Sequence, residues 1–235
     1  MCIRDSYDQY ADNSLSTTQG IYAYWALHTD VLSKERLDKL VAHLTDTTKF
    51  NRPHRVPSLS HSHPKYKANG RYWVGGVWPG TNYMIIAGLI DKGYRQLAWD
   101  ITMNHYNNVL EVYKKTGTFF EYYAPESNNP GFMARKDFVG WTGLPPIAEL
   151  IEYIFGIRAN HEQNTITLDV NLLDAYGIDK YPYGQEGLIS FKVQKRNSKE
   201  EKPKVTIQTN VPFKVILLWS NKKIEQQVGI GKHSL

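Results

Sequence analysis

Residues 72–93, YWVGGVWPGTNYMIIAGLIDKG, pass from an aromatic, glycine-rich loop into an apolar segment that ends on a glycine. Thr81 stands where a helix N-cap belongs, and Gly93 stands where a left-handed residue ends a helix. The apolar residues between them predict a buried helix over residues 81–93. The apolar run is shorter than the roughly 20 residues that cross a membrane, so we expect no membrane span here.

Helical patterns flank this segment on both sides. Residues 94–117 continue the helical spacing and end on lysines and Gly117, and residues 144–157 begin next to two prolines, which the first turn of a helix tolerates. Upstream, residues 16–32 and 33–46 each open on a serine, a residue type that caps helices. The first part of the chain therefore predicts helical hairpins.

Two long loops, residues 47–80 and 116–143, separate the helices, and loops of this length usually carry function. After Arg158, short segments alternate apolar and polar residues between turn signals, which is typical of strands. We predict a mainly α fold, with helical hairpins forming a curved toroid over residues 1–158. A small antiparallel β region over residues 159–235 follows. The expected strands lie in the segments 164–170, 187–196, 202–210 and 213–220.

Composition narrows the class of protein. Of the 235 residues, 41% are hydrophobic and 22% charged, as in an ordinary globular domain. The 16 tyrosines and 6 tryptophans suit stacking on sugar rings. The net charge of +5 is concentrated from Lys192 to Lys232, where ten Lys and Arg accompany three Asp and Glu. Without a nucleic-acid motif, this charge indicates the solvated face of the β region, so we expect neither a nucleic-acid nor a membrane partner.

The first residues, MCIRDSYDQYADN, contain neither a capped helix nor an apolar stretch for a signal peptide. Cys2 is the single cysteine, which excludes an intrachain disulfide and a thiolate metal site. We therefore expect the chain to begin inside a domain. These residues do not fix the compartment or the oligomeric state.

Glu121 lies within TGTFFEYYAPE, residues 116–126, between two phenylalanines and two tyrosines. Aromatic surroundings disfavour the charged form of a carboxyl group by desolvation, which is the setting of a tuned acid or base. The alternative is a glutamate that points into solvent at a helix end while the rings pack inward, a commoner arrangement. On these residues alone, both interpretations stay open.

The loop before residues 81–93 supplies three more rings, Tyr72, Trp73 and Trp78. The glycine pair between the tryptophans lets the backbone pass close to a ligand. Asn82 carries both a donor and an acceptor for a sugar hydroxyl. A turn that packs into the core explains the same residues without a ligand.

The loop after Glu121 adds a second acid, Asp137, with Phe138 and Trp141 close behind it. Asp137 either contacts a substrate hydroxyl or pairs with Arg135 at the surface, where an ion pair contributes little. Both loops thus combine aromatic rings with polar groups.

Three histidines, His54, His61 and His63, raise the question of a metal. Catalytic zinc usually requires three protein ligands, and the sequence contains no His-Glu-X-X-His motif. Prolines also interrupt the histidine segment. We expect no metal and no cofactor.

Together, these segments resemble the C-terminal half of the six-hairpin inverting glycosidases, in particular the trehalase-like and family 63 enzymes, which include mannosylglycerate hydrolases and processing α-glucosidases. The resemblance covers residues 14–158. It rests on VPSLSHSHPKY (56–66), GRYWVGGVWPGTNYMIIAGLIDKGY (70–94), GTFFEYYAPES (117–127) and ARKDFVGWTGLPPIAELIEYIFGI (134–157). It implies a partial (α/α)6 toroid and hydrolysis of an α-linked glucoside or mannoside.

By this resemblance, Glu121 is the general base that activates water. The residues that it implies for substrate binding are Tyr72, Trp73, Trp78, Asn82, Tyr83, Asp137, Phe138 and Trp141.

Inverting hydrolysis also needs a general acid. The Gly-X-Asp-X-Ser type loop that carries it in these families does not occur in this sequence. We therefore expect the acid in an upstream part and an inactive isolated chain, with Asp137 and Glu126 as the first alternatives. A non-catalytic carbohydrate-binding module would use the same rings without needing Glu121.

Overall fold

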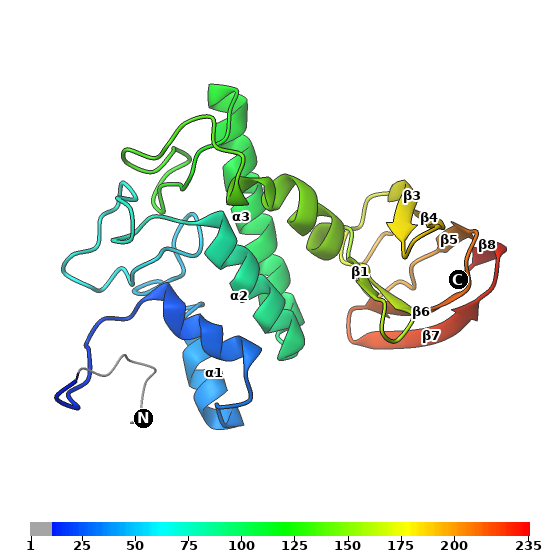
Figure 1. Ribbon diagram of the computed structural model, residues 1–235, viewed down its shortest axis with the longest axis horizontal. Coiled ribbons are helices and arrows are strands. Elements are labelled where there is room, and N and C mark those ends of the chain that lie inside the picture. Colours follow the sequence, from blue (N-terminus) through cyan, green and yellow to red (C-terminus); the bar gives the residue numbers. More distant parts are fainter. Residues whose placement is uncertain (1–10) are drawn as a thin grey trace. The chain divides into compact units, whose positions relative to one another are not determined.

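The computed structural model describes residues 11–235, and the chain divides into two compact units, Met1–Glu149 and Leu150–Leu235 (Figure 1). Unit 1 contains helices and long loops, and unit 2 contains the strands. The helix over Pro145–Ile154 runs across the boundary between the units, whereas the sequence pattern changes only after Arg158.

Within unit 1, helix α2 packs against η1 and α3 (Figure 1). In chain order, the helices of the described residues are the 3₁₀ helix η1 (Ile21–His28), the α-helices α1 (Lys34–Ala42), α2 (Pro79–Asp91) and α3 (Arg95–Thr116), the 3₁₀ turn η2 (Trp141–Gly143) and the π-helix η3 (Pro145–Ile154). The long loops before α2 and after α3 lie together on one side of these two helices in Figure 1.

Local signals explain the bounds of α2 and α3. Pro79 occupies the first turn of α2, where its missing N–H costs nothing. Gly117 ends α3 with a φ of 73°, a left-handed conformation that favours glycine, and its N–H donates to the carbonyl of Tyr113 at 2.7 Å. The helices predicted over residues 81–93 and 94–117 are therefore confirmed, with their glycine stops. The predicted N-cap is wrong, because α2 begins at Pro79 and Thr81 lies inside its first turn.

Two other predicted helices have a different type. Within residues 16–32 only the 3₁₀ helix η1 forms, because Gly20 is extended and pairs with Leu59. Within residues 144–157 the helix is a π-helix, with the N–H of Glu149 donating to the carbonyl of Leu144 at 2.8 Å. Apolar periodicity does not separate the helix types here, because η1 and η3 are only 8 and 10 residues long and their repeats diverge little over so few turns.

Unit 2 consists of two four-stranded sheets. One sheet has the order β1 (Ile157–Asn160), β2 (Thr165–Asp169), β6 (Phe213–Trp219) and β7 (Lys222–Val228). The other has the order β3 (Tyr176–Tyr183), β4 (Gly187–Val193), β5 (Val205–Thr209) and β8 (Gly231–Ser234). Alternate residues of both sheets, such as Phe191, Ile207 and Leu217, are buried in one common core.

The predicted fold class, a mainly α partial toroid, is wrong. About 29% of the structure is helical and 25% is strand. Strands β1, β3, β7 and β8 were not predicted. All four are mostly exposed or half-buried and lack a clear apolar alternation, and Ile157 of β1 was assigned to the preceding helix. The β region is not purely antiparallel either, since β2 pairs in parallel with β6. The long chain between β2 and β6, which contains β3 to β5, permits a parallel return.

A small core in unit 1 determines where the two long loops sit. It joins Val109 and Val112 of α3 to Val77 from the loop before α2 and to Phe120 and Tyr123 from the loop after α3.

Along the described residues, no helix combines the length and hydropathy that a membrane crossing requires.

Candidate functional site

The two long loops of unit 1 meet beside α3. Val77 and Tyr123 pair as an antiparallel bridge, with both N–H···O distances at 2.9 Å. The N–H of His54 donates to the carbonyl of Pro125 at 2.8 Å, and Phe120 pairs with Lys136. The segment that carries Glu121 is thereby fastened to the first loop by main-chain bonds.

Glu121 is half-buried, and its backbone is held on both sides. Its N–H donates to the carbonyl of Arg135 at 3.0 Å, and its carbonyl accepts a hydrogen bond from the indole Nε1 of Trp141 at 2.7 Å. Partial burial raises the pKa of Tyr122, and the charge of the neighbouring Glu121 raises it further. The two hydrogen bonds fix the position of the Glu121 backbone, from which its side chain extends.

An aromatic stack lies beside Glu121. Trp78 stacks on Trp73 with ring centroids 4.3 Å apart and on Tyr122 at 4.4 Å. Tyr72 meets Trp78 edge-on at 5.2 Å, and Trp141 lies 5.8 Å from it. Rings that are far apart in the sequence therefore form one cluster around Trp78.

The rings of this cluster differ in solvent exposure, so that one ring is buried and supports others that are exposed. Trp78 is only 3% exposed because Trp73 and Tyr122 cover its faces. By contrast, Trp73 is 37% exposed, Trp141 40% and Tyr72 55%. The rings available to stack on a ligand are therefore Tyr72, Trp73 and Trp141, while Trp78 supports them.

Asn82 is fully buried at the start of α2. Its Oδ1 accepts from the N–H of Val56 at 2.7 Å, and its Nδ2 donates to the carbonyls of Val56 and Trp78 at 3.2 and 3.0 Å. Direct contact of Asn82 with a sugar would require these bonds to break. The next residue, Tyr83, is half-buried on the same helix.

Asp137 is exposed and accepts a hydrogen bond from Thr118 Oγ1 at 2.7 Å. Arg135 lies over the ring of Phe138 at 5.8 Å. Phe138 in turn packs against Trp141, with ring centroids 4.9 Å apart. The second loop therefore adds Phe138 and Trp141 to the aromatic cluster, with Asp137 at its edge.

The three histidines of the first loop have separate surroundings. His54 is fully buried, and its Nε2 lies 2.8 Å from Nδ1 of the buried His105, whereas His61 is exposed. His63 is half-buried. Residues 11–235 contain no group of three or more His, Cys, Asp or Glu side chains arranged to hold a metal ion.

A polar recess of about 510 Å³ opens in unit 1, but it contains none of the predicted site residues. Its lining residues are Thr17, Gln19, Lys49, Ser60, Ser62, His63, Pro64 and Lys65. No carboxyl group lines it, so this recess offers no acid or base pair for hydrolysis.

Sequence reasoning missed two polar contacts of the first loop, one to the second loop and one to α3. Arg52 forms an ion pair with Glu126, and His54 contacts His105. The partners lie 74 and 51 positions apart in the chain, so no local pattern links them. Opposite charges in the two long loops were the one available signal for the ion pair.

A half-buried glutamate beside exposed tryptophan and tyrosine rings, carried on loops between helices, is an arrangement typical of carbohydrate-binding sites. The model of the mannosylglycerate hydrolase MGH1-like glycoside hydrolase domain matches residues 4–142, more than half of the chain. The chain belongs to this family, and the resemblance to the family 63 glycosidases is confirmed.

Two relatives illustrate this membership. A probable mannosyl-oligosaccharide glucosidase of Schizosaccharomyces pombe is 27% identical over 151 residues, which cover 59% of this chain and 18% of that protein. The mannosylglycerate hydrolase MGH1 of Selaginella moellendorffii is 34% identical over 97 residues, which cover 41% of this chain and 18% of that protein. The chain thus spans less than one fifth of either relative.

A solved structure of a sialidase matches both units. It aligns with 89% of this chain and 22% of its own, with a TM-score of 0.64 at 14% identity. At this identity the likeness shows the fold alone.

Proposed function

We propose that this chain carries the general base of an inverting glycoside hydrolase that acts on an α-linked mannoside or glucoside, and that Glu121 is this base. The observation that supports the proposal is the half-buried Glu121, fixed by two main-chain hydrogen bonds next to exposed aromatic rings. The family and the names of two relatives support a mannosyl or glucosyl substrate.

In this mechanism, a sugar ring stacks on the exposed faces of Trp73 and Trp141. Glu121 accepts a proton from a water molecule, whose oxygen attacks the anomeric carbon on the face opposite the leaving group. The bond to the leaving group breaks with its electron pair, and the product is the β-anomer. Inverting enzymes separate the two carboxyl groups by roughly 6.5–9.5 Å to make room for this water.

The general acid is a separate question. Glu126 is held by Arg52 and Tyr66, and Asp137 is exposed and bonded to Thr118. Neither group is arranged to donate a proton to a leaving oxygen. Because the chain spans less than one fifth of these relatives, we propose that the acid belongs to a part of the enzyme other than residues 11–235.

A substrate that needs no acid tests the base directly. Fluoride leaves without being protonated, so the chain should hydrolyse α-mannosyl or α-glucosyl fluoride but not the corresponding alkyl glycosides. Glu121→Gln keeps the shape of the side chain but does not accept the proton. It should lower kcat on the fluoride by about 10²- to 10⁴-fold.

Glu111→Gln is the matched control, because it removes an exposed ion pair with Lys114 on the same unit. Proton NMR of the first product should identify the β-anomer. Undiminished turnover by Glu121→Gln would show that another residue is the base. Sugar binding without hydrolysis of any fluoride would favour a non-catalytic carbohydrate-binding module.

A further inference from the structure

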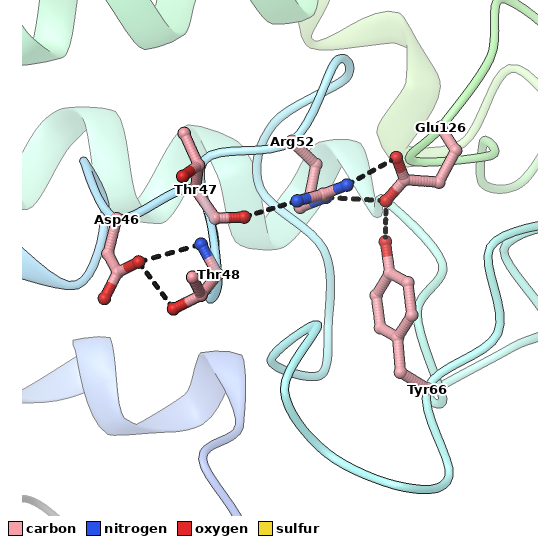
Figure 2. A network of polar contacts seen from close by, with 6 residues as sticks. All are labelled: Asp46, Thr47, Thr48, Arg52, Tyr66 and Glu126. Atoms are coloured by element: carbon pink, nitrogen blue, oxygen red, sulfur yellow. Dashed lines mark hydrogen bonds and ion pairs between the residues drawn. The ribbon is translucent and has the colours of Figure 1, made fainter.

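The charged groups that join the two long loops form a compact network (Figure 2). Arg52 Nε donates to Glu126 Oε1 at 2.6 Å, and its Nη2 donates to Oε2 at 2.8 Å. The Tyr66 hydroxyl donates to the same Oε1 at 2.7 Å. The two parallel hydrogen bonds of a bidentate arginine–carboxylate pair are strong and fix the relative orientation of the two groups. The pair therefore constrains how the Glu126 carboxylate is oriented toward Arg52.

The network is sheltered from water. The Arg52 side chain is 16% exposed and that of Glu126 is 23% exposed. Partial burial alone raises the pKa of Glu126, but hydrogen bonds from Arg52 and Tyr66 outweigh it and bring the pKa below its usual range. Glu126 is therefore an ionised anchor, unsuited to donating a proton.

The first loop prepares Arg52 for this contact. Asp46 Oδ1 accepts hydrogen bonds from the N–H and the hydroxyl of Thr48 at 2.8 and 2.7 Å. This turn directs the carbonyl of Thr47 toward Arg52, which donates to it through Nη1 (Figure 2). The Arg52 guanidinium is therefore bound both to the Thr47 carbonyl of its own loop and to Glu126 of the second loop.

Glu126 lies on the same short segment as Glu121. Between them, Tyr123 pairs with Val77, and the carbonyl of Pro125 accepts the N–H of His54. The ion pair between Arg52 and Glu126 holds the C-terminal end of residues 121–126 through side chains. A shift of Glu126 would be transmitted through these few residues to the Glu121 backbone.

We infer that Arg52 and Tyr66 are positioning residues, which hold Glu121 at its working place through Glu126. The catalytic importance of this role rests on the proposed function of Glu121. A displacement of about 1 Å costs catalysis up to about 10²-fold. Loss of the network should therefore lower kcat by about 10- to 100-fold while KM changes less than about 3-fold.

The test compares Glu126→Gln, Tyr66→Phe, Arg52→Met and Arg52→Lys in the full chain. Arg52→Lys keeps the charge but not the bidentate fork, so it should recover part of what Arg52→Met loses. Glu111→Gln, which also removes one glutamate charge, should leave amide hydrogen exchange, kcat and KM unchanged.

Amide hydrogen exchange gives a readout that does not depend on activity. In Glu126→Gln, the amides of Glu121, Tyr123 and His54 should exchange at least about 10-fold faster, while those of α3 stay as in the parent. Equal acceleration in α3 would mean general destabilisation and would overturn the inference, as would unchanged exchange at Glu121.

The second readout is kcat and KM on the α-glycosyl fluoride. Unchanged kcat in Glu126→Gln and Arg52→Met would also overturn the inference. Failure of the proposed function looks different, since Glu121→Gln would then retain parental turnover or the parent would have none. In that case the exchange data still decide whether the network holds the Glu121 segment.

Discussion

Acidification should destabilise unit 1 through the buried histidine pair. His54 and His105 are fully buried, with Nε2 of the first 2.8 Å from Nδ1 of the second. Their other ring nitrogens are enclosed and have no hydrogen-bond partner among residues 11–235. Because one ring donates and the other accepts, the pair suits two neutral imidazoles. Protonation would place charge in an enclosed site.

The magnitude follows from the pKa change. Burial lowers the pKa of His105 to about 3, and that of His54 falls well below its usual value through burial and the nearby His105. An unfolded histidine has a pKa of about 6.5. The unfolded chain therefore binds more protons, so stability present above pH 6.5 is lost as the pH falls toward 3. His105 alone should cost about 3 kcal/mol by about pH 4, at ~1.4 kcal/mol per pH unit.

The assay is urea unfolding at pH values from 4 to 7, followed by tryptophan fluorescence. Trp25, Trp73, Trp78, Trp99 and Trp141 belong to unit 1, and only Trp219 belongs to unit 2. Fluorescence therefore reports mainly on the unit that contains the histidine pair.

His105→Asn retains a polar group near Nδ1 but does not titrate. Its free energy of unfolding should fall less steeply with acid than that of the parent, by about 1.4 kcal/mol per pH unit. Carboxyl groups such as Glu126 titrate in both proteins, so subtraction removes their effect. His61→Asn, at an exposed position, should follow the parent. Parallel curves for parent and His105→Asn would refute the reasoning.

Three further predictions concern Glu149, the stacked pair Trp73 and Trp78, and Gly76. Glu149 is fully buried, neither of its carboxyl oxygens has a hydrogen-bond partner in the described part of the chain, and burial raises its pKa well above the usual value. Glu149→Leu should therefore raise the free energy of unfolding by about 1–3 kcal/mol, with a gain in urea unfolding that grows as pH rises above about 4.5, and a loss of stability would contradict this. Trp78→Ala should cost about 3–5 kcal/mol of stability, whereas Trp73→Ala should mainly weaken mannose or glucose binding in a fluorescence titration; equal effects of the two would contradict the division into support and surface. A Cβ on Gly76 would lie 2.5 Å from the Tyr72 carbonyl and 3.0 Å from the Tyr122 ring, so Gly76→Ala should disturb the stack and lower sugar affinity, while Gly229→Ala, where nothing lies within 4 Å, should not.

The sequence by itself determined features that depend on neighbouring residues. The C-terminal ends of α2 and α3 lie next to Gly93 and Gly117, the glycines that the sequence marked as helix stops. The alternation in β4 and β6 marked those strands. The family was recognisable because its motifs are short, ordered and local.

Tertiary structure decided features that depend on contacts between distant residues. Apolar spacing did not distinguish the 3₁₀ helix η1 or the π-helix η3 from α-helices, and it did not reveal the exposed strands that make the mainly α prediction wrong. Strand pairing in parallel between β2 and β6 depends on the path of the intervening chain.

The candidate site divides in the same way. The sequence indicated Glu121 and the rings, because carboxylates and aromatic side chains are conspicuous by type. Only the fold buried Trp78 between two rings, occupied the amide of Asn82 with backbone groups, and brought Arg52 to Glu126. The sequence gives the type of each side chain directly. Its solvent exposure and its hydrogen-bond or ion-pair partners depend on contacts between distant residues, which form only when the chain folds.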